Sequence, residues 1–307
     1  MDCNQTGNPE EIAKAFSSLD PMSQESAENV LREAHEIMQQ LGVTFFLRQG
    51  TCLGAVRDNA IMPWDDDIDI GSLIGHHGLT QKSLPDVLKQ VVNVFTERGF
   101  STISGHTAEF HWISMIKSSV RIDWECFKVI RCNILHFPSQ WFPARLFQNL
   151  KEIDFLGTTF LIPNPPEEYL ALKYGPEWRT PKKAGAYEND VLDTIPEPPT
   201  IEGFKKLKEL LLSRIFKRPP AKLLVLDDQG IPVPGANVMV VGVGKTKTDE
   251  RGCTNLFIHN DFQYALTIQY RNHKELLYIE NLTPGTSYIY RADPSSNSGR
   301  AFVLSAN

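Results

Sequence analysis

The residues of this sequence best suited to chemistry are acids that alternate with apolar side chains. Asp65, Asp67 and Asp69 stand two apart in WDDDIDIG, with isoleucines at the alternate positions that follow. On a β-strand, residues two apart point to the same side, so these three carboxylates are predicted to form one row, with Asp66 on the opposite side. Like charges at this spacing raise one another's pKa, so an ordered row favours a bound divalent cation, Mg²⁺ or Mn²⁺. A solvated acidic turn is the alternative interpretation, and the apolar neighbours favour the metal site.

A glycine-containing turn precedes the acids. Gly50 and Gly54 flank Thr51 where a predicted strand, 43–47, is followed by a short predicted helix, 51–56. Backbone N–H groups and the helix dipole can hold a phosphate at such a turn. A tight structural turn is the alternative. Because the acids follow directly, we expect a phosphate cradle that faces the carboxylate-bound cation.

Further charged residues are candidates for the same site. Asp123 lies on the polar face of a predicted hairpin strand, 120–127, and adds a carboxylate if that strand pairs beside the first. Arg57 is the first candidate to neutralise phosphate oxygens, with Lys173 and the two arginines Arg48 and Arg121 behind it. Alternatively, Asp123 is a surface acid on an edge strand, and the basic residues are surface charges or members of structural ion pairs.

Amphipathic helices are predicted around these strands. Apolar residues recur at helical spacing over 23–42 and 87–95, and 204–216 resembles a charged helix. A proline-rich, charged connection covers 176–200. We therefore predict an α/β catalytic domain over residues 1–219.

The sequence changes character after the paired prolines at 219–220. Short β-type runs alternate with turn signals such as Pro234-Gly235 and Pro284-Gly285. This pattern predicts a small all-β sandwich domain over residues 220–307.

Composition narrows the class of protein. The chain has 307 residues, a net charge of -6 and a pI of about 5.8, which argues against a general nucleic-acid backbone binder. Apolar runs fall far short of the ~18 residues of a membrane-spanning helix, and the polar, acidic N-terminal residues do not resemble a signal peptide. We expect a cytoplasmic protein with no transmembrane segment. The five cysteines contain no C-x-x-C pair, so no disulfide framework or structural zinc site is expected.

Several stretches together resemble one known family. The segment GTCLGAVRDNAIMPWDDDIDIG resembles the signature of the LicD family, which includes bacterial phosphocholine transferases, fukutin and fukutin-related protein. The resemblance continues in VRIDWECF, FLGTTFLIPNPPEEYLALKYG and PEWRTP, and so covers roughly residues 41–181. It implies a nucleotidyltransferase-like fold.

The resemblance also implies roles for individual residues. Asp67 and Asp69 would bind the catalytic Mg²⁺, Asp65 or Asp123 would complete the acidic set, and Gly50-Thr51 would lie against the donor phosphate. Family members transfer a phospho-alcohol unit, such as phosphocholine or ribitol phosphate, from a CDP-activated donor to a glycan hydroxyl. The expected partners are thus a CDP-alcohol and a glycan or polyol-phosphate acceptor, such as a cell-surface polymer.

The sequence departs from the family pattern at Cys52, where an aliphatic residue is common, and at Asp58-Asn59. Those differences bear on donor identity more than on metal binding. The membrane anchor and zinc-binding insertion of the Golgi members are not matched by any of these segments, and we do not expect either feature from the resemblance. The tail, 221–291, resembles a transthyretin-like accessory domain in GIPVPGANVMVVGVGKTKTDERG and LTPGTSYIY.

Two other functions fit the same residues. In one, the phosphate cradle and paired acids transfer a nucleotide itself to a small molecule or protein. In the other, the protein is a non-enzymatic metal-binding or glycan-binding protein whose acids hold only a structural cation. Turnover in the presence of a divalent cation distinguishes these possibilities.

Overall fold

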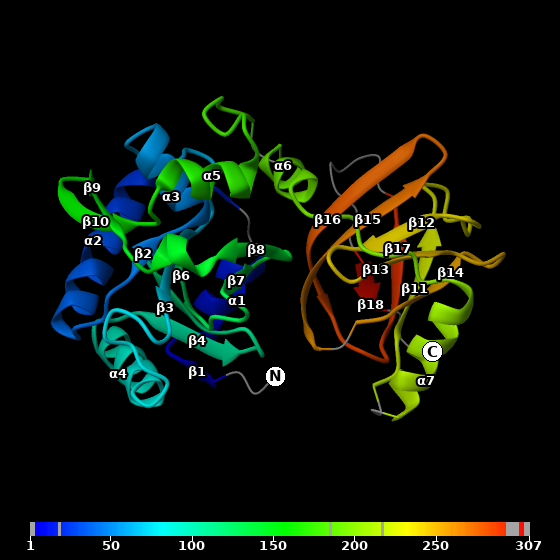
Figure 1. The fold of residues 1–307 in the computed structure, drawn as a ribbon, viewed down its shortest axis with the longest axis horizontal. Coiled ribbons are helices and arrows are strands. Elements are labelled where there is room, and N and C mark those ends of the chain that lie inside the picture. Colours follow the sequence, from blue (N-terminus) through cyan, green and yellow to red (C-terminus); the bar gives the residue numbers. More distant parts are fainter. Residues whose placement is uncertain are drawn as a thin grey trace. The chain divides into compact units, whose positions relative to one another are not determined.

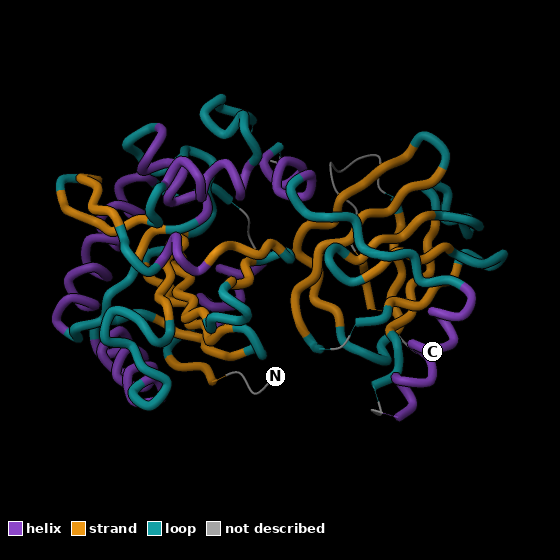
Figure 2. The backbone as a smooth tube through the Cα atoms, in the orientation of Figure 1, coloured by secondary structure: helices purple, strands orange, loops and turns teal. Residues whose placement is uncertain are grey.

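The computed structural model describes residues 4–17, 20–183, 186–215, 218–258, 260–292 and 301–303 (Figures 1 and 2). Its contacts divide the chain into two units, Met1–His136 with Trp141–Ala184, and Phe137–Gln140 with Gly185–Asn307. Among the described residues, no helix combines the length and apolar character needed to cross a membrane.

A mixed six-stranded sheet organises the first unit, with the strand order β1-β4-β5-β6-β3-β2. β3 and β6 run parallel to each other, and every other neighbouring pair is antiparallel. The strands are β1 (Asn4–Thr6), β2 (Phe46–Leu47), β3 (Ile68–Leu73), β4 (Ser101–His106), β5 (Phe110–Lys117) and β6 (Val120–Phe127).

Four helices of this unit contact the sheet. They are α1 (Pro9–Ser17), α2 (Gln24–Gln40), α3 (Gln49–Arg57) and α4 (Leu84–Glu97). α2 and α4 pack against each other, and α2 contacts β6 while α4 contacts β4 and β5 (Figure 1). α1 also contacts β4 and β5, and α3 contacts β3. α3 thereby leads directly from β2 to the strand that carries the acids.

The predicted local elements of this unit are confirmed where the pattern is strong. Ser23 caps α2 with its side chain, and Gly42 follows at φ +66°. α4 is likewise followed by Gly99 at φ +83°. The predicted hairpin is β5–β6, and its turn residues Ser118 and Ser119 both have positive φ, as a two-residue type I′ turn requires.

Smaller elements complete the first unit. α5 packs against α3, and β9 pairs with β10 in a two-stranded sheet. β7 and β8 form another two-stranded sheet. The bounds are β7 (Asn133–His136), β8 (Gln140–Pro143), the 3₁₀ turn η1 (Ala144–Phe147), β9 (Lys151–Phe155), β10 (Thr158–Ile162) and α5 (Pro166–Tyr174).

The second unit contains two four-stranded sheets, ordered β14-β11-β17-β18 and β13-β12-β15-β16. Buried residues from both sheets, among them Leu223, Val238 and Leu266, form one apolar core. The strands are β11 (Ala221–Leu226), β12 (Asn237–Val240), β13 (Gly244–Lys247), β14 (Cys253–Leu256), β15 (Phe262–Tyr270), β16 (His273–Leu282), β17 (Ser287–Arg291) and β18 (Ala301–Val303). The predicted β content of the tail is confirmed, and its sandwich and transthyretin-like assignments stay predictions.

Two helices precede these strands in the second unit, α6 (Tyr187–Asp193) and α7 (Gly203–Ile215). The contacts divide the chain at residues 184 and 185, earlier than the predicted boundary between 219 and 220, because both helices are grouped with the β-rich unit. α7 is the charged helix predicted over 204–216.

Candidate active site

Two aspartates on neighbouring strands form the centre of the candidate site. In the parallel pair β3–β6, Asp69 lies opposite Asp123, and Gly71 lies opposite Glu125 two residues later. Paired positions on strands about 4.8 Å apart present their side chains on the same face. The predicted pairing of the Asp123 strand beside the first acidic strand is therefore confirmed.

The acids before β3 lie differently from the prediction. Residues 63–64 form a turn and β3 begins only at Ile68, so Asp65, Asp66 and Asp67 precede the strand. The alternation of a strand does not apply to them. The predicted single row, with Asp66 turned away, is therefore wrong.

Arg121 on β6 gathers the acids of this loop. Its Nη2 lies 2.5 Å from Asp67 Oδ2 and 3.6 Å from Asp66 Oδ2, and its Nε lies 3.2 Å from Asp123 Oδ2. Nη1 donates to the carbonyl of Ala15 in α1 at 2.8 Å. Burial alone would lower the pKa of Arg121, but the nearby carboxylates outweigh it and raise the pKa. Arg121 is thus a fixed cation shared by three acids.

Arg48, just before α3, is a second cation shared by acids of the sheet. Its Nη2 lies 2.9 Å from Asp69 Oδ1 and 3.2 Å from Glu125 Oε1, and its Nε donates to the Ile70 carbonyl at 3.1 Å. The residue is only 1% exposed. Burial works to lower the pKa of Arg48, and Asp69 and Glu125 raise it above its usual value.

The start of α3 holds Asp69 in place. Gln49 has a positive φ of 46° and donates from Nε2 to Asp69 Oδ1 at 3.0 Å, while its backbone N–H donates to the Tyr169 hydroxyl at 2.9 Å. The Thr51 hydroxyl accepts the backbone N–H of Asp69 at 2.9 Å. Thr51 therefore supports the acidic strand directly, and its expected contact with a donor phosphate stays a prediction.

The buried carboxylates are costly to ionise. Burial, reinforced by Asp67 and Asp123, raises the pKa of Asp69 to about 8 despite the opposing effect of Arg48. Burial and Asp67 raise the pKa of Asp66 to about 6. Burial also raises the pKa values of Asp123 and Glu125.

Lys173 of α5 belongs to the same electrostatic cluster. It is 1% exposed, and burial lowers its pKa to about 7, against the opposing influence of Asp69 and Glu125. The cluster contains more acids than bases: five carboxylates, Asp66, Asp67, Asp69, Asp123 and Glu125, face three cations, Arg48, Arg121 and Lys173. With all groups ionised it lacks two positive charges.

Gly50 and Gly54 are required by close packing of the acidic loop on α3. A Cβ on Gly50 would lie 2.9 Å from Asp65 Oδ2, and one on Gly54 would lie 2.5 Å from the Ala60 carbonyl oxygen. The absence of side chains lets residues 60–65 lie directly on the helix. This placement brings Asp65 to the start of α3, while the phosphate cradle itself stays a prediction.

Arg57 lies at the other end of α3. Its Nε and Nη2 donate to the two carboxylate oxygens of Asp58 at 2.9 and 2.6 Å, and Nη2 also approaches Met62 Sδ at 3.6 Å. Its side chain is 6% exposed. In this conformation Asp58 occupies the guanidinium, so the predicted phosphate contact would require Arg57 to exchange partners.

The carboxylates of the cluster are candidate ligands for a divalent cation. Within the described ranges, no three His, Cys, Asp or Glu side chains are arranged as a ready-made metal site, because the arginines hold the acids. The donor chemistry fits all the same, because the groups are carboxylate oxygens, which Mg²⁺ and Mn²⁺ prefer, and the acids outnumber the bases. A site for this cation would form if Asp67, Asp69 and Asp123 turned from the arginines toward one another.

Sequence reasoning missed four residues of this cluster: Asp66, Glu125, Gln49 and Tyr169. Glu125 was detectable, because it stands two residues after Asp123 on the same strand face. The hydrogen bonds of Gln49 and Tyr169 have no signal in the sequence, since they depend on the positive φ of Gln49 and on α5 packing against α3.

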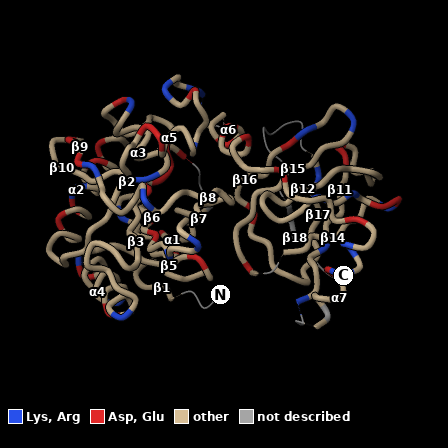
Figure 3. Tube along the Cα trace, viewed as in Figure 1, with Lys and Arg blue, Asp and Glu red and all other residues tan. Residues whose placement is uncertain are grey.

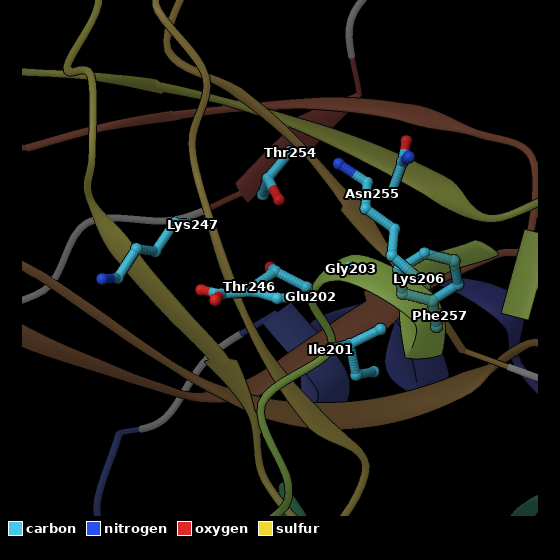
Figure 4. A pocket seen from close by; sticks show the side chains of 9 residues that line it. All are labelled: Ile201, Glu202, Gly203, Lys206, Thr246, Lys247, Thr254, Asn255 and Phe257. Carbon is cyan, nitrogen blue, oxygen red and sulfur yellow. The ribbon is translucent and has the colours of Figure 1, made fainter. Parts of the chain in front are cut away.

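Two cavities, of about 180 and 250 Å³, lie in the second unit. The smaller is lined by α7, β13 and β14 and includes Lys206, Thr246 and Phe257 (Figure 4). Figure 3 shows basic and acidic residues interspersed along the trace of each unit. Neither cavity is lined by an acid of the β3–β6 cluster.

Comparison with known proteins gives a family for part of the chain. Residues 42–165 match the LicD/FKTN/FKRP nucleotidyltransferase domain. The matched range contains α3, β3 and β6, and therefore every predicted site residue except Lys173.

Individual relatives agree with the family match. Human ribitol 5-phosphate transferase FKRP is 28% identical over 149 residues, which cover 46% of this chain and 29% of FKRP. Human ribitol-5-phosphate transferase FKTN is 22% identical over 174 residues, which cover 52% of this chain and 34% of FKTN. Protein RP689 of Rickettsia prowazekii is 25% identical over 202 residues, or 65% of this chain and 70% of that protein. The chain thus spans about a third of the two ribitol-phosphate transferases.

Proposed function

We propose that this protein is a transferase that moves a phospho-alcohol unit from a CDP-activated donor to a hydroxyl of a glycan or polyol-phosphate polymer, with Mg²⁺ or Mn²⁺. The observation that carries the proposal is the Asp69–Asp123 pair on parallel strands inside the family match. The relatives named as ribitol-phosphate transferases support the phospho-alcohol class.

In this proposal Asp67 and Asp69 hold the divalent cation, and Asp65 or Asp123 completes the acidic set. When bound, the cation would neutralise charge on the transferred phosphate and on the phosphate of the CMP leaving group. Arg48 and Gln49 keep Asp69 oriented. Asp123 or another acid of the cluster accepts the proton of the acceptor hydroxyl.

The donor would lie against the start of α3. Gly50 and Thr51 contribute backbone N–H groups there, and Gly54 allows the acidic loop to approach. Arg57, released from Asp58, and Lys173 are the proposed phosphate-neutralising side chains. The nucleotidyltransferase-like fold assignment belongs to the same proposal.

The test is turnover by the purified chain. We expect release of CMP from one member of a panel of CDP-alcohols when Mg²⁺ and a glycan acceptor are present, and none when a chelator replaces Mg²⁺. Asp69→Asn is the inactive control, and Asp86→Asn, at an exposed position on α4, is the matched charge control.

The same assay distinguishes the other two functions. Release of pyrophosphate from a nucleoside triphosphate, without CMP from any CDP-alcohol, would show nucleotide transfer instead. Cation-dependent binding of CDP-alcohols with no product under any condition would leave only the binding-protein interpretation and reject the proposal.

A further inference from the structure

Helix α7 in the second unit presents its apolar side chains to solvent. Phe204, Leu207, Leu211 and Ile215 follow one another at intervals of three, four and four residues, and their exposed fractions are 81, 54, 50 and 70%. Intervals of three and four place residues on one face of a helix. The four side chains thus form a continuous outward-facing row, here called the apolar stripe.

The half-buried residues of α7 are Glu209, Leu210, Leu212 and Ser213, and this side of the helix lies toward the β-strands. Glu209, Leu212 and Ser213 line one cavity together with Ile258, and Lys206 lines the other beside Phe257 (Figure 4). A surface helix normally buries its apolar stripe against the core and exposes its charges. On α7 the apolar stripe is exposed together with the lysines, so the stripe is not used to hold the fold of its own unit.

The charge around the stripe indicates what covers it. Residues 203–218 contain six Lys or Arg and one acid, a local charge of +5 in a chain whose net charge is -6. Lys205 and Lys208 are exposed and follow Phe204 and Leu207 directly in the sequence. Among the residues that the structure describes, neither lysine forms an ion pair.

We propose that α7 is an interfacial helix that docks this protein on an anionic lipid bilayer. A bilayer offers a negatively charged headgroup layer directly above an apolar layer, and the helix carries cations directly beside an apolar row. Long lysine side chains can reach the headgroups while the stripe enters the acyl boundary. The inference goes beyond the proposed transferase activity and does not depend on it.

Vesicle sedimentation tests the proposal. The full chain is mixed with vesicles of phosphatidylcholine alone, and with vesicles of phosphatidylcholine and phosphatidylserine. We expect binding to the anionic vesicles, weaker binding as salt is raised, and little binding to phosphatidylcholine alone. Absence of binding to the anionic vesicles at low salt would overturn the proposal.

Paired variants connect binding to α7. Leu207→Ser combined with Leu211→Ser should reduce partition to the anionic vesicles at least about tenfold, because it removes two side chains from the membrane-facing row. Lys205→Glu combined with Lys208→Glu should remove the dependence on phosphatidylserine. Ile279→Ser, 43% exposed on β16, and Lys274→Glu are the matched controls and should bind as the wild type does.

All of these positions are exposed, so the variants should keep the melting temperature of the wild type. Equal vesicle binding by the Leu207→Ser/Leu211→Ser variant would overturn the assignment of the site to α7. Concentration-dependent dimers that this variant dissolves, in a protein that does not bind vesicles, would assign the stripe to a second copy of the chain and reject the bilayer.

Discussion

Asp69 and Asp123 lie opposite each other on parallel strands, yet each is held by a different arginine. Arg48 reaches Asp69 from the start of α3, and Arg121 reaches Asp123 from two residues away on the same strand. The two acids are therefore neighbours on adjacent strands, and each is paired with its own arginine. A cation that bound both would have to compete with these arginines.

The first prediction concerns Arg48, which is buried between Asp69 and Glu125. Arg48→Met should lower the free energy of unfolding by about 3 to 5 kcal/mol, because it leaves two buried acids without their cation. Arg145→Met removes an exposed pair with Glu168 and should cost much less, because solvent screens that pair. Urea denaturation of both variants measures the difference, and equal costs would show that Arg48 contributes only a surface-type ion pair.

The second prediction separates the two glycines of α3. Gly54→Ala should cost about 1 to 3 kcal/mol of stability, because its Cβ would lie 2.5 Å from the backbone oxygen of Ala60. Gly50→Ala should cost less, since its nearest atoms are the movable carboxylate oxygens of Asp65 at 2.9 and 3.0 Å. Denaturant midpoints test the order of the two costs, and a larger cost at Gly50 would mean that Asp65 is rigidly fixed.

The third prediction concerns Asp67 and Asp66, which share Arg121. We expect Asp67→Asn to abolish cation-dependent transfer, because Asp67 is a proposed ligand. Asp66→Asn should reduce it only partly, because Asp66 lies 3.6 Å from the guanidinium and Asp67 lies 2.5 Å from it. Calorimetric titration with Mg²⁺ and CMP-release assays measure both effects. If the two variants lose the same activity, both acids hold the cation.

Local patterns predicted much of the first unit. The β5–β6 hairpin and α2 follow from alternation, a turn and a cap, all of which act between residues near in sequence. The strand carrying Asp69 was found, but its start was placed too early, because the turn at residues 63–64 and Arg121 of β6 determine where Asp65, Asp66 and Asp67 lie. Arg121 lies more than fifty residues after these acids, so a local sequence pattern cannot show that it holds them.

Close packing was equally hidden from the sequence. Gly50 and Gly54 were interpreted as a phosphate turn, whereas the structure shows that Asp65 and Ala60 need the space. The two roles are compatible, because a glycine backbone without a Cβ atom leaves space for a packed loop and also for a phosphate. In the second unit the turn signals predicted short strands, but the parallel pairing of β11 with β17 joins segments about sixty residues apart.

The last prediction uses the pH dependence of stability to test the charge of the site. The pKa of Asp69 rises from its usual value of 3.8 to about 8, first because of burial. Between these values the folded protein binds a proton that the unfolded chain does not, so the free energy of unfolding falls as pH rises from about 4 to 8. Asp69→Asn removes this cost, and the variant should gain stability relative to the wild type from pH 5 to pH 7, by at most about 1.4 kcal/mol per pH unit.

Lys173 titrates at the upper end of this pH range. Burial lowers its pKa to about 7, so above about pH 7 the folded protein has lost a proton that the unfolded chain keeps, and the free energy of unfolding then rises with pH in both proteins. Urea denaturation of both proteins at pH 5, 6 and 7 measures the slope, with Asp86→Asn as the exposed control. Added Mg²⁺ should stabilise the wild type more at pH 7 than at pH 5, because ionised Asp69 binds the cation, and should have little effect on Asp69→Asn. Parallel stability curves for the wild type and Asp69→Asn would show that Asp69 is ionised throughout this pH range, and would contradict the raised pKa of Asp69.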